Sequence, residues 1–182
     1  MRATPLLLAA LLAAPALAAT RHDSTAPINF GADHIELQDK ANRAVLSGDV
    51  QVTQAEMSLA AQRMTVAYTG QVVNGNPQVS RLDAAGDVVV RRPDQTATSR
   101  FAVYDLNRRL ITMLGGVTLH QGANTVSGGR LTINLDTGRA VIDGSAVGGG
   151  AATGATQTTP SGRVTGTFSV PKRENQPAPP TP

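Results

Sequence analysis

The sequence predicts an all-β domain, an elongated sandwich or jelly roll of antiparallel strands. Three observations lead to this prediction: apolar and polar residues alternate with a period of two, two strand-sized half-motifs repeat along the chain, and helix signals are missing throughout. Successive side chains of a strand point to opposite faces, so this alternation gives each strand one apolar face. The 182 residues, 41% hydrophobic and 16% charged, suffice for one domain with a buried core.

The first 18 residues have the pattern of a secretory signal peptide. Arg2 provides an early positive charge, an apolar run follows at residues 6–14, and Ala16 to Ala18 form a small-residue cleavage site. A spanning helix needs roughly 20 apolar residues, so cleavage is favoured over a retained anchor. We expect residues 19–26 to be a flexible N-terminus.

Export would bring the chain to an oxidising compartment, yet the chain contains no Cys. The fold must therefore be held by burial and hydrogen bonds without disulfides. The 16 Lys and Arg residues against 13 Asp and Glu give a net charge of +3, and they are scattered along the chain. This balance is too weak to indicate nucleic-acid binding.

Two short strands open the predicted jelly roll, which we expect to span residues 27–147. The first strand carries Ile28 and Phe30 on one face, and the second carries Ile35 and Leu37 on one face. Each alternates with polar neighbours, as expected of half-buried strands.

Two half-motifs then alternate along the chain. The first contains glycine and appears as LSGDVQV, AAGDVVV, LGGVTL and IDGSAV; the second begins with arginine and appears as RMTVAY, RFAVYD and RLTINLD. Each is one amphipathic strand, and glycine stands where a strand of the first kind begins its inward run. Asp39, Asp105 and Asp136 follow strands at turns, where a carboxylate can accept backbone hydrogen bonds, so we expect them to be structural.

The end of the chain is less regular. Residues 148–162 form a Gly-rich linker that is too poor in large apolar residues to pack. Residues 163–170, RVTGTFSV, recover the alternation and predict a last edge strand, and residues 171–182 form a disordered Pro-rich tail.

The first and last strands would leave unpaired backbone groups at the two ends of the sheet. Such edges can add a strand from a partner. The candidate partner-binding residues at these edges are Ile28, Phe30, Val164, Phe168 and Val170.

The alternating apolar positions of the strands predict which residues face the interior. The interior face is almost wholly aliphatic, since the chain has three Phe, two Tyr and no Trp, and we infer an interior slot lined by medium-sized side chains. A lining that packs against itself is equally compatible with the pattern. The candidate lining residues are Ile35, Leu37, Leu46, Val50, Val52, Met64, Val66, Val88, Phe101, Val103, Met113, Val117, Leu119, Leu131 and Ile133.

No motif indicates catalysis or a metal. His22, His34 and His120 are isolated, so no zinc ligand set is recognisable. Nucleophile-elbow and phosphate-binding glycine motifs are missing, and the carboxylates alternate outward or lie in turns. We therefore expect neither an enzyme nor a cofactor.

Three stretches carry a resemblance to a known family: PINFGADHIELQDKANRAVLSGDVQVTQAEMSLAAQRMTVAY, LNRRLITMLGGVTLHQGANTVSGGRLTINLDTGRAVIDG and GRVTGTFSVP. They are similar to the OstA-like domain family of periplasmic lipopolysaccharide-transport bridge proteins, the LptA family. The resemblance covers residues 27–171, and the order and spacing of the motifs carry it.

This resemblance implies an open β-jelly roll in the periplasm whose interior lining accepts the acyl chains of lipid A. It implies lipopolysaccharide as the cargo and head-to-tail stacking of like domains into a homo-oligomer. It further implies the inner-membrane transport complex as partner at the first-strand edge and the outer-membrane translocon at the last-strand edge. The alternative from a different class is a structural envelope protein that polymerises edge to edge without lipid.

Overall fold

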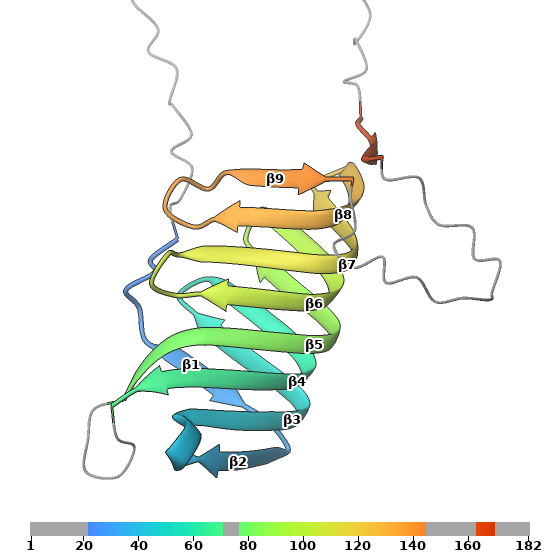
Figure 1. The fold of residues 1–182 in the computed structure, drawn as a ribbon. Helices are drawn as coiled ribbons and strands as arrows, with labels where there is room; N and C mark the ends of the chain where they lie inside the picture. The colour runs from blue at the N-terminus through green and yellow to red at the C-terminus, as the bar shows by residue number, and fades with distance from the viewer. Residues whose placement is uncertain (1–21, 71–76, 145–162, 170–182) are drawn as a thin grey trace, which may run out of the picture.

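The computed structural model describes residues 22–70, 77–144 and 163–169, and within these ranges the chain is an antiparallel β-sheet of ten strands (Figure 1). The elements are β1 (Ile28–Gly31), β2 (His34–Gln38), the 3-10 helix η1 (Asp39–Ala41), β3 (Arg43–Gln54), β4 (Met57–Thr69), β5 (Gln78–Arg92), β6 (Gln95–Asp105), β7 (Leu110–Gln121), β8 (Asn124–Asn134), β9 (Ala140–Asp143) and β10 (Thr165–Thr167).

The long strands β3 to β8 each pair with their neighbours in sequence, so the chain forms an up-and-down meander. The order across the sheet is β1-β3-β4-β5-β6-β7-β8-β10, and β2 also pairs with β3 while β9 also pairs with β8. Each end of the sheet therefore carries two short strands. The predicted all-β open jelly roll is confirmed.

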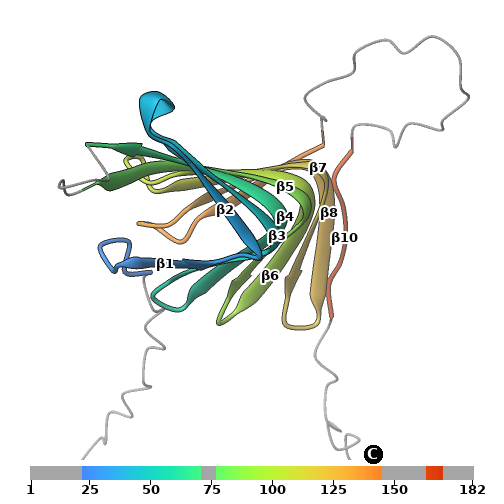
Figure 2. The same ribbon diagram turned by 90° about the horizontal axis from the view of Figure 1, so that it is seen from below.

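The sheet is folded over into two layers that meet along a spine and diverge on the other side (Figure 2). We call the layer that includes β2 and β9 the first layer, and the layer that includes β1 and β10 the second layer. Every long strand crosses the spine, so one half of it belongs to each layer. The side on which the layers diverge is called the open side below.

Glycines occupy the bends of the strands that carry the glycine half-motif. The register shifts after Ser47 in β3 and after Ala85 in β5, where Gly48 and Gly86 take φ values of 77° and 82°. Glycine adopts this left-handed conformation without the steric cost of a Cβ. The repeated glycine thus marks the passage of a strand from one layer to the other.

The two layers enclose one hydrophobic core. A row of facing residues runs across the first layer through Met64, Ala84, Ala102, Met113 and Leu131, all at most 3% exposed. The aligned rows of the two layers bury medium-sized aliphatic side chains against each other, which is the main contribution to stability in such a sandwich.

The acidic turn residues are structural, as predicted. The carboxylate of Asp105 accepts a hydrogen bond from the backbone N–H of Arg108 at 2.9 Å. Asp136 accepts from Arg109 Nη1 at 2.8 Å, and Asp39 accepts from the hydroxyl of Tyr68 at 3.0 Å. These contacts hold the connections between strands on the first-layer side.

Several predictions concern residues outside the described ranges. The signal peptide at residues 1–18, the linker at residues 148–162, Val170 and the tail at residues 171–182 lie outside the described residues. The strand β10 lies within the predicted last strand, and the remaining domain boundaries stay predictions. No helix in the described ranges is long and apolar enough to cross a membrane.

Candidate functional site

Most of the predicted lining residues lie in the interior. The following are 6% exposed or less: Leu46, Val50, Val52, Met64, Val66, Val88, Met113, Val117, Leu131 and Ile133. Leu119 is partly buried and packs against this core. Their inward placement is confirmed, while their contact with lipid stays a prediction.

The prediction that Phe101 and Val103 face the interior is wrong. Phe101 is 50% exposed, and its partners in the neighbouring strands are Ala85 and Leu114. Ala85 in turn pairs with Arg63, so Phe101 belongs to the outward row of Arg63. Val103 alternates with inward residues on the same strand and also faces outward.

The cause is an irregularity where β6 bends. Ser99 and Ala102 are both buried, at 8% and 2% exposed, so the two residues between them, Arg100 and Phe101, both lie outward. The hydroxyl of Ser99 donates to the carbonyl oxygen of Phe101 at 2.8 Å and stabilises this bend. A bulge of this kind changes which of the alternating positions of a strand face the core.

Ile35 and Leu37 were expected to be part of the lining, but they are 43% and 57% exposed. They pair with Leu46 and Ala44, and facing residues share one side of a sheet, so they continue the interior face. Their exposure arises because β2 is the last strand at its end of the first layer. The lining thus runs out to an uncovered edge.

The four apolar residues of β1 and β2 form what we call the N-terminal edge: Ile28, Phe30, Ile35 and Leu37. Phe30 pairs with Val52 and is 53% exposed. At the other end of the sheet, the C-terminal edge consists of Val164 and Phe168, 43% and 68% exposed, which flank β10. The predicted apolar edges are therefore present among the described residues, and their partners stay predictions.

The interior is filled by side chains. The largest of them, including Tyr104, Leu59 and Leu82, are 1% exposed or less. One cavity of about 300 Å³ lies over the outer face beside Arg63 and Phe101, and another of about 170 Å³ lies at the open side. Phe101 and Val103 border the first of these cavities, and none of the lining residues that face inward borders either.

The segment that precedes β1 lies on the open side. Residues 22–27, which we call the strap, lie where the two layers diverge, against the hairpin that joins β3 to β4 (Figure 2). Thr25 donates to the carboxylate of Asp23 from its backbone N–H at 2.9 Å and from its hydroxyl at 2.6 Å. These hydrogen bonds lower the pKa of Asp23 and give the strap a defined turn.

Gln54 connects the strap to both layers. Its amide nitrogen donates to the carbonyl oxygens of Ser24 at 3.0 Å and Ala26 at 3.1 Å. Its Oε1 accepts from the hydroxyl of Tyr104 at 2.6 Å and lies 3.3 Å from His22 Nε2. The amide uses its two donors and both lone pairs of its oxygen, so this residue, 2% exposed, is fully satisfied.

Tyr104 brings the first layer to this junction. Burial raises its pKa to about 12, an effect that Arg109 opposes and Asp136 reinforces. The neutral hydroxyl is therefore the form present at ordinary pH, and it is available to donate to Gln54. This role of Gln54 was not identified from the sequence, although Gln54 lies on the same face of β3 as Val50 and Val52.

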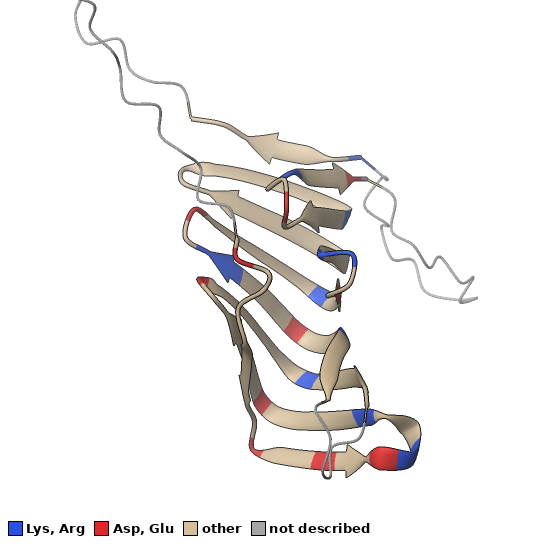
Figure 3. Cartoon of the chain, turned by 90° about the vertical axis from the view of Figure 1, so that its left-hand side faces the viewer, with Lys and Arg blue, Asp and Glu red and all other residues tan. Residues whose placement is uncertain are grey.

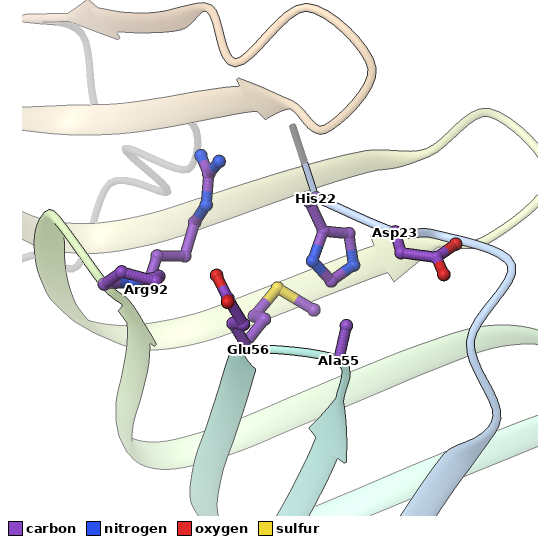
Figure 4. Close-up of a pocket in the computed structure, with 7 residues that line it drawn as sticks. His22, Asp23, Ala55, Glu56 and Arg92 are labelled. Carbon is purple, nitrogen blue, oxygen red and sulfur yellow. The ribbon is translucent and has the colours of Figure 1, made fainter. Parts of the chain in front are cut away.

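A small cavity separates the strap from the hairpin tips of the second layer. His22, Glu56, Met57 and Arg92 line it (Figure 4). Arg92 Nη1 is buried and has no hydrogen-bond partner among the described residues. The described part of the chain holds no group of three His, Asp or Glu residues that could bind a metal ion.

The charged side chains gather in no single patch. Lys, Arg, Asp and Glu residues are dispersed along the strands and turns of the described ranges (Figure 3). Two ion pairs form among these residues, Arg81 with Asp83 at 2.6 Å and Arg109 with Asp136 at 2.8 Å. The distribution offers no continuous basic surface for a nucleic-acid backbone.

The comparisons with known proteins agree on one family. Residues 30–139 match the model of the family described as LptA/(LptD N-terminal domain) LPS transport protein. A protein of Rhizobium meliloti that is uncharacterized is 32% identical over 121 residues, 64% of this chain. The chain spans 65% of the length of that relative.

Two further similarities are to one protein of Pseudomonas aeruginosa. The lipopolysaccharide export system protein LptH is 29% identical over 147 residues, 78% of each chain. The crystal structure of LptH, described as the LptA homologous periplasmic component of the lipopolysaccharide transport device, superposes with a TM-score of 0.63. The superposition has 24% sequence identity and covers 82% of this chain and 99% of that chain, so it supports the fold.

Proposed function

The chain belongs to the LptA/(LptD N-terminal domain) family of LPS transport proteins, and on this premise we propose that it carries lipopolysaccharide across the periplasm. In this proposal the acyl chains of lipid A occupy the space between the two layers. The sugar part of the lipid stays outside, because the interior offers almost only apolar side chains.

The observation that carries the proposal is the continuation of the interior face to uncovered ends. Ile35 and Leu37 lie in register with buried residues of β3 and are themselves 43% and 57% exposed. A sandwich whose only task is to be stable has no need to leave such residues open, because exposed apolar patches at sheet ends favour association. End-to-end contact of two copies would join their interiors into one apolar path.

Burial of hydrocarbon is the expected source of affinity. Each CH2 group removed from water contributes about 0.8 kcal/mol, so a 12-carbon chain contributes on the order of 9 kcal/mol. Since side chains fill the core, part of this free energy is offset by separating the layers. The direction of transport requires energy from a partner, and we propose an inner-membrane complex at the N-terminal edge and an outer-membrane translocon at the C-terminal edge.

Mass spectrometry of lipid that copurifies with the mature protein tests the carrier function. We expect lipopolysaccharide or lipid A at close to one molecule per chain. Protein that is folded, isolated from a lipopolysaccharide-producing cell and free of lipid would contradict the proposal.

The packed core favours a second candidate function, a structural envelope protein that polymerises through its edges without cargo. Tight packing is what a purely structural sandwich requires. The same mass spectrum separates the two candidates, because the structural protein should carry no lipid.

A further inference from the structure

We propose that the strap, residues 22–27, is a lateral closure of the interior, and that Gln54 is the positioning residue that holds it closed. In this inference lipid enters and leaves through the open side, between the diverging layers, when the contacts of Gln54 break. The inference rests on the proposed function and adds the route and the residue that controls it.

The position of the strap supports this role. The layers are joined by continuous strands at the spine, so they can separate only on the side where they diverge (Figure 2). The strap lies on that side, and His22 and Asp23 line the cavity between it and the hairpin tips, together with Met57, which is 3% exposed (Figure 4). The cavity marks the place where the closure is incomplete.

The attachment of the strap is concentrated in one side chain. Within the described ranges, the hydrogen bonds that join the strap to the rest of the sheet all involve Gln54, through Ser24, Ala26 and His22. The hydrogen bonds of Asp23 with Thr25 and Ala26 stay inside the strap. The strap can therefore detach as a unit when the hydrogen bonds of Gln54 break.

The same side chain also ties the layers together. Gln54 comes from the second-layer half of β3, and Tyr104 comes from the first-layer half of β6. Their hydrogen bond of 2.6 Å spans the interior close to the strap. One side chain therefore holds both, the strap through its amide nitrogen and the first layer through its Oε1.

A reversible tether tests the closure without replacing Gln54, whose bonds to Ser24, Ala26 and Tyr104 stay in place. The chain contains no Cys, so His22→Cys and Ala55→Cys introduce two thiols that face one cavity. A short reducible bis-methanethiosulfonate joins them, and the rate of uptake of purified rough lipopolysaccharide is measured before tethering, after tethering and after reduction. We expect uptake to slow at least about tenfold on tethering and to recover on reduction.

The matched control places the same tether on the outer face. Arg91→Cys and Thr96→Cys are facing residues of the β5–β6 hairpin, and their tether should leave uptake unchanged. Uptake by the strap-tethered protein at its untethered rate would overturn the closure while leaving the carrier function standing. No uptake by the untethered protein would contradict the carrier function, and the closure with it.

A substitution series gives an independent readout. Gln54→Leu removes the side-chain hydrogen bonds that join the strap to the sheet within the described ranges, and we expect about tenfold faster lipopolysaccharide uptake and a more mobile spin label at Thr25→Cys. Tyr104→Phe removes the bond between the layers but leaves the bonds to Ser24 and Ala26, so the label at position 25 should stay immobile. Equal label mobility in Gln54→Leu and in the parent chain would overturn the inference.

Discussion

The hydroxyl of Tyr104 donates a 2.6 Å hydrogen bond to the side-chain oxygen of Gln54, and the two residues come from opposite layers of the folded sheet. They are 1% and 2% exposed. A buried polar bridge across an aliphatic core is costly to break, because each group left unsatisfied loses the compensation for its desolvation. It therefore fixes the separation of the layers at this point.

The first prediction concerns alkaline stability. Burial raises the pKa of Tyr104 from 10.0 in the unfolded chain to about 12. The unfolded state therefore loses this proton first, and the contribution of Tyr104 is complete below pH 10 and is lost as the pH rises towards 12. The free energy of unfolding should fall by about 2 to 3 kcal/mol more in the parent chain than in Tyr104→Phe over that interval.

Urea unfolding at closely spaced pH values checks this. Tyr68, whose pKa is also raised by burial and by its hydrogen bond to Asp39, is present in both chains and cancels from the difference. If the free energy of unfolding fell equally with pH in the parent chain and in Tyr104→Phe, the raised pKa of Tyr104 would be contradicted.

The second prediction concerns the bends. Gly86 has φ 82°, and a Cβ there would lie 2.6 Å from Gln62 Oε1, so Gly86→Ala combines strain with crowding. Gly116 has φ 75° and open space, and Gly31 has open space without a left-handed backbone. We expect the free energy of unfolding to fall by about 2 to 3 kcal/mol in Gly86→Ala and by about 1 to 2 kcal/mol in Gly116→Ala. In Gly31→Ala it should fall by less than about 0.5 kcal/mol. Thermal unfolding of the three variants gives the ranking, and equal losses would contradict it.

The third prediction separates the inward from the outward row. Leu131→Ala removes a fully buried side chain and should cost about 2 to 5 kcal/mol. Phe101→Ala removes a larger side chain that is 50% exposed, and its cost should stay near 1 kcal/mol or less. Chemical denaturation measures both, and a larger loss for Phe101→Ala would place Phe101 in the core after all.

The fourth prediction concerns the N-terminal edge. Leu37→Asp puts a charge on an apolar residue that is 57% exposed, so it should weaken head-to-tail association at least about tenfold without lowering the melting temperature. Phe101→Asp is a control of similar exposure away from the sheet ends. Sedimentation velocity over a concentration series distinguishes them, and equal association by the Leu37→Asp variant and the parent chain would argue against this edge as an interface.

The strands were predictable because their signal is local. A half-buried strand alternates with a period of two whatever surrounds it, and the predicted strands around Met64, Leu131 and the first three glycine half-motifs are present. The fourth, IDGSAV, extends beyond β9 into residues outside the described ranges. The repeated position of glycine at the start of the inward run was also predictable. That these glycines lie where a strand bends from one layer to the other was not predictable, because such a bend depends on the packing of the two layers on each other.

The face of β6 was mispredicted for a related reason. RFAVYD was aligned with RMTVAY through its arginine, yet Phe101 pairs across the sheet into the row of Arg63 and not into that of Met64. Only the pairing register reveals this shift. Gln54 was missed because a polar residue beside a turn usually meets water, and its partner Tyr104 lies 50 positions away in sequence.

Site-specific photo-crosslinking in cells shows whether lipopolysaccharide occupies the space between the two layers. A photo-reactive residue at Leu46 or Leu131, both 0% exposed, should capture lipopolysaccharide in cells, whereas one at Phe101 or Gln51 on the outer face should not. We expect capture to be confined to the two interior positions. Equal capture at all four positions, or capture at Phe101 and Gln51 alone, would contradict it.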